Sequence, residues 1–462
     1  MIKLENTPNQ EITTIVEAQR AFFRSGETLS LKHRQKALCT LSKALKLWES
    51  RIAEALWKDL HKSYEEAYMT ELSIVLGEID NHLHHLKLWM SPKPVGTPIK
   101  MMPSRSKVIA EPLGCSLIMA PWNYPVQLLL NPLVGAISSG CTAILKPSPY
   151  VPHVSKVLEQ MIKESFSPEY IAVVQGNREV NTALLEQRFD LIFFTGSPDL
   201  GRKVMRAASE HLTPVVLELG GKSPCIVDKD ANIAMAARRI AWGKSLNAGQ
   251  TCIAPDYLLV HADVKEQLVS ALKKEFNRLH GANPKESKHF VRIVNERAFD
   301  RLVGYIQGAD VVMGGEYDRE ERYIAPTLID HVDVNSPIMQ EEIFGPIFPI
   351  VTFSTTEEAI RFVTDREKPL ALYYFGESKK NIRNVLKHTS SGGACINDTI
   401  MHIANEKLPF GGVGQSGMSA YHGKDSFKVF SHYRAVVTTT TCLDLPFRYM
   451  PYKFFKWVKK LL

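Results

Sequence analysis

CSLIMAPWNYPVQLLLNPLVGAISSGCTAILKPS, residues 115–148, contains two short apolar runs with a helical stretch between them. Residues 115–119 and 142–145 have the length of buried strands, and residues 126–138 have the length of a helix. Two neighbouring strands that are joined through a helix lie parallel, and helices then cover both faces of the sheet. The stretch therefore predicts a βαβ unit and places the chain in the α/β class.

The same alternation continues along the chain, so we expect two Rossmann-like parallel sheets. Further strands are expected at residues 171–174, 191–194, 215–217, 225–227 and 257–260, and further helices at residues 154–163, 199–209, 231–245 and 265–279. Gly220 and Gly221 interrupt this pattern and are typical of a hinge between two α/β units. A helical stretch at residues 17–90 comes before the first unit.

Two segments fit neither sheet. Residues 92–109 are rich in proline and are expected to be extended, and residues 436–441 (VVTTTT) are typical of an edge strand, which needs a partner. We divide the chain into a first domain, a second domain and a small β element, which are residues 1–91 with 110–219, residues 220–424, and residues 92–109 with 425–444.

Composition and charge indicate a globular protein without a nucleic-acid surface. The 462 residues are 45% hydrophobic and 23% charged, and 56 basic against 49 acidic residues give a net charge of +7. Five of the basic residues and no acidic residue lie in the tail, residues 445–462, so the rest of the chain carries only +2. Such a weak charge does not favour nucleic acid as a partner.

Cysteine usage and the N-terminus favour a cytoplasmic protein. The seven cysteines are widely spaced and form no C-x-x-C pair, which argues against a disulfide framework and a zinc site. His82, His84 and His85 have no acidic or cysteine companions, and we interpret them as a solvated helix face rather than as metal ligands. The N-terminus lacks the apolar run of a signal peptide, and polar residues and Pro132 interrupt the apolar stretch at 128–145.

Three residues supply the groups that acyl chemistry on a carbonyl needs. Cys252 lies in the polar, flexible sequence NAGQTCIAP and can act as a nucleophile. Glu218 ends an apolar run and can activate a water molecule, and Asn123 follows another run and can donate to an oxyanion. Each also has a structural interpretation: a buried thiol, a solvated carboxylate at a strand end, and a turn residue, respectively.

The motifs around these residues resemble the aldehyde dehydrogenase superfamily. Further matching motifs are FTGS at 194–197, EEIFGP at 341–346 and LPFGGVG at 408–414, and they occur in the order found in the family. The segments IAPDY at 253–257 and SGMSAYHG at 416–423 resemble its class 3 branch, which includes fatty and aromatic aldehyde dehydrogenases. The resemblance extends from about Ala21 to His432.

The resemblance implies a catalytic role for each of the three residues. Cys252 would form a thiohemiacetal with an aldehyde, and Asn123 would stabilise its oxyanion together with the backbone N–H of Cys252. Glu218 would activate the water that hydrolyses the thioester. Relatives that transfer the acyl group to coenzyme A usually lack this glutamate, so its presence favours water as the acceptor and a carboxylic acid as the product. Residues 1–91 with 110–219 then become a cofactor-binding domain, and residues 220–424 a catalytic domain.

Oxidation of the adduct requires a hydride acceptor, and a nicotinamide is the obvious one. Residues 412–417 match G-x-G-x-x-G, but no strand leads into them, so we reject them as a dinucleotide site and expect close backbone packing there. Residues 193–201 follow a strand and open a helix, where Gly196 permits the turn, Ser197 can donate to phosphate and Gly201 allows close packing.

Four more residues are assigned to the cofactor through the resemblance. Lys146 and Ser148 resemble the segment that contacts the adenosine ribose, and Glu342 and Phe344 resemble the residues that hold the nicotinamide ribose and ring. NAD-preferring relatives commonly carry a glutamate where this chain has Pro149. Because proline does not repel a 2′-phosphate, we expect the enzyme to accept NADP as well as NAD.

The expected substrates are medium-chain, long-chain or aromatic aldehydes. Trp242 and Leu246 lie four residues apart, which predicts a shared helix face, and with Tyr124 they could line an apolar channel; core packing is the alternative. A coenzyme A-acylating or semialdehyde-specific dehydrogenase, and a catalytically silent relative, are the competing hypotheses.

The resemblance also implies a homodimer. In the family, a strand like the one expected near residues 436–441 joins a protruding hairpin, here residues 92–110, to form the dimer contact. In the tail, helical spacing of residues 453–462 predicts an amphipathic helix, with lysines on one side and apolar side chains on the other. Two interpretations stay open for this helix: weak contact with an anionic membrane, and docking on the partner subunit.

Overall fold

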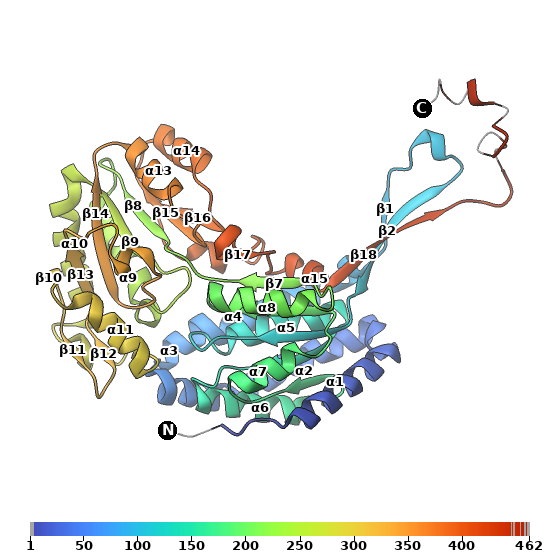
Figure 1. Cartoon of the computed structure of the whole chain (residues 1–462), viewed down its shortest axis with the longest axis horizontal. Coiled ribbons are helices and arrows are strands. Elements are labelled where there is room, and N and C mark those ends of the chain that lie inside the picture. The colour runs from blue at the N-terminus through green and yellow to red at the C-terminus, as the bar shows by residue number, and fades with distance from the viewer. Residues whose placement is uncertain (1–3, 445, 447–448, 453, 457–458, 460–462) are drawn as a thin grey trace.

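The structure is a computed structural model and describes residues 4–444, 446, 449–452, 454–456 and 459. It contains two α/β units and a three-stranded arm that projects from one of them (Figure 1). The amphipathic helix predicted at residues 453–462 lies largely outside the described residues. Among the described residues, no helix has both the length and the apolar character that crossing a bilayer requires.

The first unit is built on a six-stranded sheet with the order β17-β7-β6-β3-β4-β5. Its strands are β3 (Cys115–Met119), β4 (Thr142–Lys146), β5 (Ile171–Val173), β6 (Leu191–Thr195), β7 (Val215–Glu218) and β17 (Gly417–Met418). The first five strands are parallel, and the short β17 runs antiparallel to β7. The strand order reverses between β3 and β6, and such a switch point is where open α/β sheets bind ligands.

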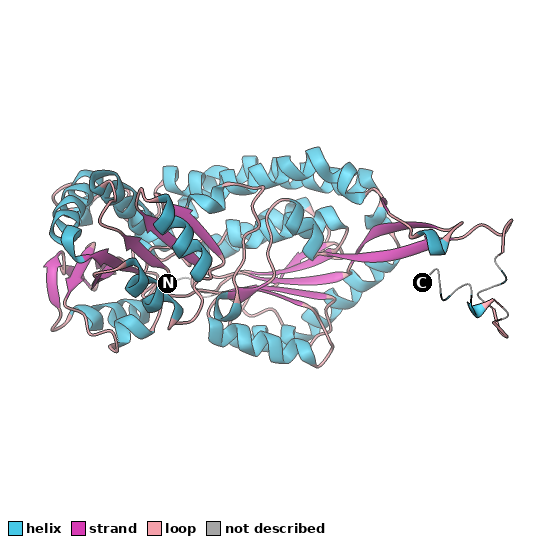
Figure 2. Cartoon of the chain, turned by 90° about the horizontal axis from the view of Figure 1, so that it is seen from above, coloured by secondary structure: helices cyan, strands magenta, loops and turns pink. Residues whose placement is uncertain are grey.

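Helices cover both faces of this sheet, as the βαβ pattern predicts (Figure 2). One face is packed by α2 (Leu31–Leu60), α4 (Ser73–Met90), α5 (Gln127–Ser139) and α6 (Pro152–Ser165). The other face is packed by α1 (Asn9–Arg24), α7 (Arg178–Leu185) and α8 (Pro198–Ser209). Helix α7 was not predicted from the sequence, because its eight residues lie in a polar stretch.

The second unit is built on a seven-stranded sheet with the order β10-β13-β14-β9-β8-β15-β16. Its strands are β8 (Pro224–Val227), β9 (Tyr257–His261), β10 (Asp310–Met313), β13 (Thr327–Asp330), β14 (Ile347–Phe353), β15 (Ala371–Phe375) and β16 (Gly393–Ile396). Helices α9 (Ile233–Ser245) and α10 (Lys265–His280) pack one face, and α11 (Glu296–Ile306), α13 (Thr356–Thr364) and α14 (Lys379–His388) pack the other. The short elements of this unit are β11 (Tyr317–Asp318), β12 (Tyr323–Ile324) and α12 (Pro337–Gln340).

The arm confirms that the predicted edge strand pairs with the proline-rich segment, residues 92–109. Strand β18 (Ser431–Thr438) pairs antiparallel with β2 (Arg105–Pro112), and β1 (Lys93–Val95) pairs with the other edge of β2. The predicted strand, residues 436–441, was placed too late, because pairing begins at Ser431 and ends at Thr438. Helix α15 (Lys424–Val429) leads from the first unit into β18.

One expectation for the N-terminal helices was wrong. His84 is exposed, but His82 is fully buried and its Nε2 lies 3.1 Å from Glu78 Oε1. Glu78 also accepts hydrogen bonds from the Gly423 backbone N–H and from the Ser426 hydroxyl. The histidine group is therefore not a uniform solvated face, because His82 belongs to a buried polar contact between α4 and the segment before β18.

Candidate active site

The three predicted chemical groups meet between the two units. Asn123 follows β3, Glu218 is the last residue of β7, and Cys252 lies in the turn after α9. All three side chains line one cavity of about 1040 Å³. The strand ends place Asn123 and Glu218 there because β3 and β7 are parallel, so their carboxyl ends open at the same edge of the sheet.

Glu218 is buried with no partner for its charge. Its side chain is only 3% exposed, and neither carboxylate oxygen has a hydrogen-bond partner among the described residues. Burial raises the pKa of Glu218 well above its ordinary value. A carboxyl group with a raised pKa, in a cavity that contains a thiol, is suited to accept a proton near neutral pH.

Cys252 is partly exposed at the cavity, whereas Cys115, Cys141, Cys225 and Cys395 are buried. Burial of the thiol, and then the nearby carboxyl groups of Glu342 and Glu218, raise the pKa of Cys252, while the backbone N–H groups of Cys252 and Ile253 oppose the shift. The resting thiol therefore holds its proton. Its nucleophilic form requires a proton acceptor, and the cavity offers the Glu218 carboxyl group, with both oxygens unpaired, and the Glu342 carboxyl group, with Oε1 unpaired.

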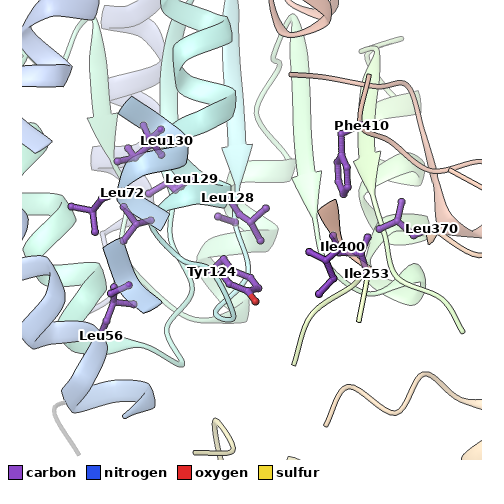
Figure 3. Close-up of a cluster of buried hydrophobic side chains, with 14 of the residues drawn as sticks. Leu56, Leu72, Tyr124, Leu128, Leu129, Leu130, Ile253, Leu370, Ile400 and Phe410 are labelled. Carbon is purple, nitrogen blue, oxygen red and sulfur yellow. The ribbon is translucent and has the colours of Figure 1, made fainter. Parts of the chain in front are cut away.

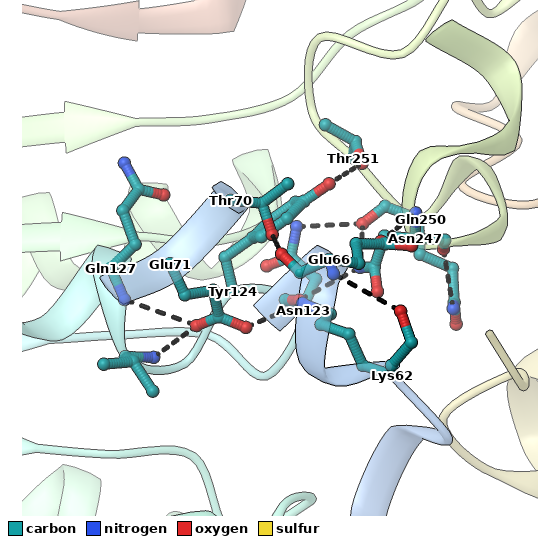
Figure 4. Close-up of polar contacts among 12 residues, drawn as sticks. Lys62, Glu66, Thr70, Glu71, Asn123, Tyr124, Gln127, Asn247, Gln250 and Thr251 are labelled. Carbon is teal, nitrogen blue, oxygen red and sulfur yellow. Dashed lines mark hydrogen bonds and ion pairs between the residues drawn. The ribbon is translucent and has the colours of Figure 1, made fainter. Parts of the chain in front are cut away.

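Asn123 is held by hydrogen bonds on both its backbone and its side chain. Its Nδ2 donates to the Gln250 carbonyl at 3.0 Å, and its own carbonyl accepts from Lys62 Nζ and from Asn247 Nδ2. Figure 4 shows these residues converging from three segments of the chain. The second N–H of the amide is not needed for the Gln250 bond, so Asn123 can still donate to a reacting oxygen.

The opposite part of the cavity has the features of a dinucleotide site. Gly196 and Ser197 lie between β6 and α8, where the first backbone N–H groups of the helix have no partner within the helix. Ser197 occupies the N-cap position, and its side chain makes no cap hydrogen bond. Gly201 packs closely as predicted, since a Cβ there would lie 2.8 Å from Leu219 Cδ2.

Glu342 and Phe344 complete this part of the cavity. Glu342 Oε1 and Thr195 Oγ1 are buried without a hydrogen-bond partner, and both residues line the cavity. Burial and the nearby Asp256 raise the pKa of Glu342 to about 8. The Phe344 ring meets Trp122 edge-on at 5.4 Å. Unpaired polar groups, a helix N-terminus and an aromatic ring together fit the phosphates, ribose and ring of a nicotinamide dinucleotide.

The remaining predicted residues do not line this cavity. Lys146 and Ser148 are buried at the end of β4, where Lys146 Nζ donates to the Pro147 carbonyl and burial lowers the pKa of Lys146 to about 8. Tyr124 is also buried, and its hydroxyl bonds to Thr251 Oγ1 at 2.8 Å. Figure 3 shows its ring on one side of the apolar cluster and Ile253, Leu370 and Ile400 on the other.

Trp242 and Leu246 lie at the C-terminal end of α9, where the Leu246 N–H donates to the Trp242 carbonyl. Helix α9 ends at Ser245, and Leu246 has a ψ of 127°, which is not helical. Asn247 and Ala248 then adopt left-handed backbone conformations. The chain therefore turns sharply before Cys252, and Trp242 and Leu246 both pack against the main hydrophobic core.

The rejected G-x-G-x-x-G segment packs closely beside Glu218, at the edge of the cavity, as expected. Gly417 pairs with Glu218 in the β17–β7 ladder, and the Leu219 N–H donates to the Ser416 carbonyl. A side chain at Gly412 would overlap the Ser416 backbone. The glycines therefore allow close backbone contact at the cavity edge, where Gln415 is one of the lining residues.

Comparison with known proteins agrees with this geometry. A sequence model of the aldehyde dehydrogenase family matches residues 1–436. The chain belongs to the aldehyde dehydrogenase family. It is 48% identical over 443 residues to 4,4'-diaponeurosporen-aldehyde dehydrogenase of Staphylococcus aureus. The aligned residues make up 95% of this chain and 96% of that protein. It is also 48% identical to rat aldehyde dehydrogenase family 3 member A2, over 91% of this chain and 87% of that protein.

Two further comparisons bear on the cofactor and the fold. The dimeric NADP-preferring aldehyde dehydrogenase of dog is 43% identical over 96% of this chain and 98% of that protein. A substrate-bound structure of AldH from Staphylococcus aureus superposes with a TM-score of 0.96 at 47% identity, and covers 97% of this chain and 99% of that chain. The protein is therefore an aldehyde dehydrogenase that uses NAD or NADP, with the α/β fold predicted from the sequence.

Several residues of this aldehyde dehydrogenase site were not predicted. Thr195 and Arg301 line the cavity, and Lys62, Glu66 and Glu71 lie behind Asn123. The FTGS segment could have indicated Thr195, because a hydroxyl beside a glycine turn is suited to a phosphate or ribose. The charged residues of the N-terminal helices carry no comparable signal, since solvated helix faces have the same residue types.

Proposed function

We propose that Cys252, Glu218 and Asn123 oxidise medium-chain, long-chain or aromatic aldehydes to carboxylic acids through a thiohemiacetal and a thioester. The observation that carries this proposal is the Glu218 carboxyl group, buried without a partner in the cavity that also contains the Cys252 thiol. One relative is named 4,4'-diaponeurosporen-aldehyde dehydrogenase, which is consistent with an apolar substrate.

In the first stage, the Cys252 thiol loses its proton to Glu218 and its sulfur attacks the carbonyl carbon. The side-chain N–H of Asn123 and the backbone N–H of Cys252 donate to the oxyanion that forms. The nicotinamide, when bound, supplies the acceptor for the hydride that leaves this carbon. The product held on Cys252 is a thioester.

In the second stage, Glu218 acts as a base toward water. The proton that it took from the thiol must first leave the site, so that the carboxylate can accept a proton from the attacking water molecule. The hydroxide adds to the thioester carbon, the carbon–sulfur bond breaks, and the acid departs while the Cys252 sulfur is released. Glu342 and Phe344, with Gly196, Ser197 and Gly201, are proposed to hold the cofactor, and Lys146 and Ser148 its adenosine ribose.

The substrate side is proposed to involve Tyr124, Trp242 and Leu246. Tyr124 belongs to the main hydrophobic core, and Trp242, Leu246 and Cys252 pack against that core. We further propose a homodimer, formed through the arm, and a cytoplasmic location. The arm supports the dimer, because it projects from the body and exposes Val95, Ile99 and Val437.

A screen of aldehydes of increasing chain length, with both cofactors and with or without coenzyme A, tests this proposal. We expect kcat/KM to rise from acetaldehyde to long-chain and aromatic aldehydes, and the free acid to form without an added thiol. An absolute requirement for coenzyme A, or activity confined to semialdehydes, would support the competing enzymes. A failure to reduce either cofactor with any aldehyde would support the silent relative.

A further inference from the structure

Three charged side chains are buried behind the oxyanion side of the active site. Lys62 and Glu71 have no exposed surface, and Glu66 is only 6% exposed. They come from the N-terminal helical layer: Lys62 follows α2, Glu66 lies in α3 (Tyr64–Ala67), and Glu71 lies in a π-helical turn, Tyr68–Leu72. None of the three lines the active-site cavity, so none is placed to touch substrate or cofactor.

Lys62 and Glu71 fix the segment that carries Asn123. Lys62 Nζ donates to Glu71 Oε1 at 2.7 Å and to the Asn123 carbonyl at 3.1 Å, and it lies 4.2 Å from the centre of the Tyr124 ring. Glu71 Oε2 accepts from the Val126 N–H at 2.8 Å. The ion pair therefore holds the segment both at Asn123 and at the start of α5 (Figure 4).

Glu66 fixes the turn that leads to Cys252. One of its carboxylate oxygens accepts from the Asn247 N–H at 2.8 Å. Asn247 has a φ of 50°, and Ala248 a φ of 51°, a region that residues other than glycine rarely adopt. Asn247 Nδ2 in turn donates to the carbonyls of Asn123 and Gln250, both at 3.0 Å. One side chain therefore ties the oxyanion segment to the nucleophile turn.

Two features distinguish this cluster from an ordinary structural ion pair. Burial of charge is costly, and apolar side chains of the same size often stabilise a fold as well. Here the charged groups instead hold two irregular backbone conformations, which are the two distinguishing features: the π-helical turn at Tyr68–Leu72 and the left-handed turn at Asn247 and Ala248. Such backbone strain persists only where the surrounding contacts impose it. Burial raises the pKa of Glu66 to about 7, although Lys62 and the Asn247 N–H act in the opposite direction.

On the basis of the roles proposed for Cys252 and Asn123, we propose that Glu66, supported by Lys62 and Glu71, is a positioning residue for the oxyanion site. Its carboxylate sets the Asn247 turn, and through that turn the distance between the Asn123 amide and the Cys252 sulfur. Oxyanion donors act over a few tenths of an ångström, so a small shift of this turn slows the steps that form and collapse the adduct.

The test compares variants of Glu66 with variants of Asp59, a matched buried acid of the same helical layer. Asp59 bonds to His153 Nδ1 at 2.6 Å and to the Val154 N–H at 3.0 Å, both at the start of α6, and it contacts neither active-site segment. The rate constant of the first-turnover burst of reduced cofactor, KM for the cofactor, and Tm are measured for Glu66→Leu, Glu66→Gln and Asp59→Leu.

We expect Glu66→Leu to slow the burst at least about tenfold without changing KM for the cofactor. Glu66→Gln keeps an acceptor for the Asn247 N–H and is expected to stay within about threefold of the parent protein. Asp59→Leu is expected to lower Tm but not the burst rate constant. A burst at the parent rate in folded Glu66→Leu, or an equal slowing in Asp59→Leu, overturns the proposal.

Two further variants keep the outcome decisive. If Glu66→Leu does not fold, Glu66→Asp withdraws the acceptor by one methylene while keeping its charge, and a burst at the parent rate in Glu66→Asp overturns the proposal. Cys252→Ser separates this inference from the proposed function on which it rests. A burst that survives in Cys252→Ser contradicts the proposed chemistry. If Cys252→Ser loses the burst but Glu66→Leu shows a burst at the parent rate, only the positioning role of Glu66 is contradicted.

Discussion

The two sides of the active-site cavity differ in how their polar groups are satisfied. On the oxyanion side, Asn123 and Asn247 are tied by hydrogen bonds to Gln250, to Glu66 and to each other, and only their Oδ1 atoms lack a partner among the described residues. On the cofactor side, Thr195 Oγ1 and Glu342 Oε1 are buried without a partner. The first side is already arranged for its task, and the second has polar groups that only a ligand or water can satisfy.

This difference separates two ways in which a mutation can impair the enzyme. Changes on the oxyanion side are expected to alter the rate of chemistry, because the groups there are preorganised for a transition state. Changes on the cofactor side are expected to alter binding, because the groups there pair only when the cofactor is present. The predictions that follow test this division, from the largest expected effect to the smallest.

Replacement of the nucleophile should have the largest effect. Cys252→Ser removes the thiol, and we expect kcat to fall by at least roughly 10³-fold because a serine hydroxyl without an adjacent strong base is a poor nucleophile. KM for the cofactor should change little. The measurement is steady-state reduction of NAD and NADP, with Cys225→Ser as a control, because Cys225 is a buried thiol outside the cavity. Retention of more than a tenth of the activity would sink the assignment.

Replacement of the base should slow both stages. Glu218→Gln can take a proton neither from the Cys252 thiol nor from water, so we expect turnover to fall by roughly 10²-fold and the burst of reduced cofactor to slow with it. In the parent enzyme, the pKa of Glu218 is raised, and its protonated form is inactive as a base. Turnover should therefore decrease as pH falls through that raised pKa, and the Glu218→Gln variant should lose this dependence. An unchanged pH profile in the variant would contradict the role.

A change of one glycine should affect the cofactor side alone. A Cβ at Gly220 would overlap the Glu342 carboxylate, so Gly220→Ala must displace that side chain. We expect KM for the cofactor to rise up to about tenfold, with a smaller change in kcat, since a lost hydrogen bond typically costs up to about 1.5 kcal/mol. Gly221→Ala is the matched control, because its Cβ would meet Pro369 Cα at an ordinary 3.5 Å. Equal effects in the two variants would show that Glu342 is not the cause.

The sequence was sufficient to predict the five parallel strands of the first sheet, strands β8 and β9 of the second sheet, and the chemical groups, because these depend on local signals. Apolar runs of strand length predicted β3, β4 and β6, and motif resemblance identified Cys252 and Glu218. The parallel strand ends bring Asn123 and Glu218 to one edge of the first sheet. Cys252 reaches the same cavity from the second unit, in the turn after α9, and the strand topology of the first sheet does not determine its position.

The supporting contacts could not be predicted, because they depend on tertiary pairing. Nothing in the composition around Lys62 and Glu66 distinguishes a buried cluster from a solvated helix face. The end of α9 at Ser245 was predicted, but the left-handed turn at Asn247 and Ala248 was not, since it depends on the Glu66 contact and on packing. Strand β17 has only two residues, too few to produce a periodic pattern.

Cofactor preference gives the smallest expected effect and tests the cofactor side at its far end. Pro149 follows Ser148 just beyond β4, at the position where many NAD-preferring relatives carry a glutamate, and it brings no charge to that position. We expect kcat/KM for NADP to lie within a thousandfold of that for NAD in the parent enzyme. Pro149→Glu should lower the value for NADP about fivefold relative to NAD, because a carboxylate repels a 2′-phosphate across solvent-screened distances. The measurement is the ratio of kcat/KM for the two cofactors at fixed ionic strength, with Pro149→Gln as the uncharged control. An equal change in Pro149→Gln would assign the effect to loss of the proline rather than to charge. The backbone conformation at residue 149, and not a charge there, would then determine the preference between NAD and NADP.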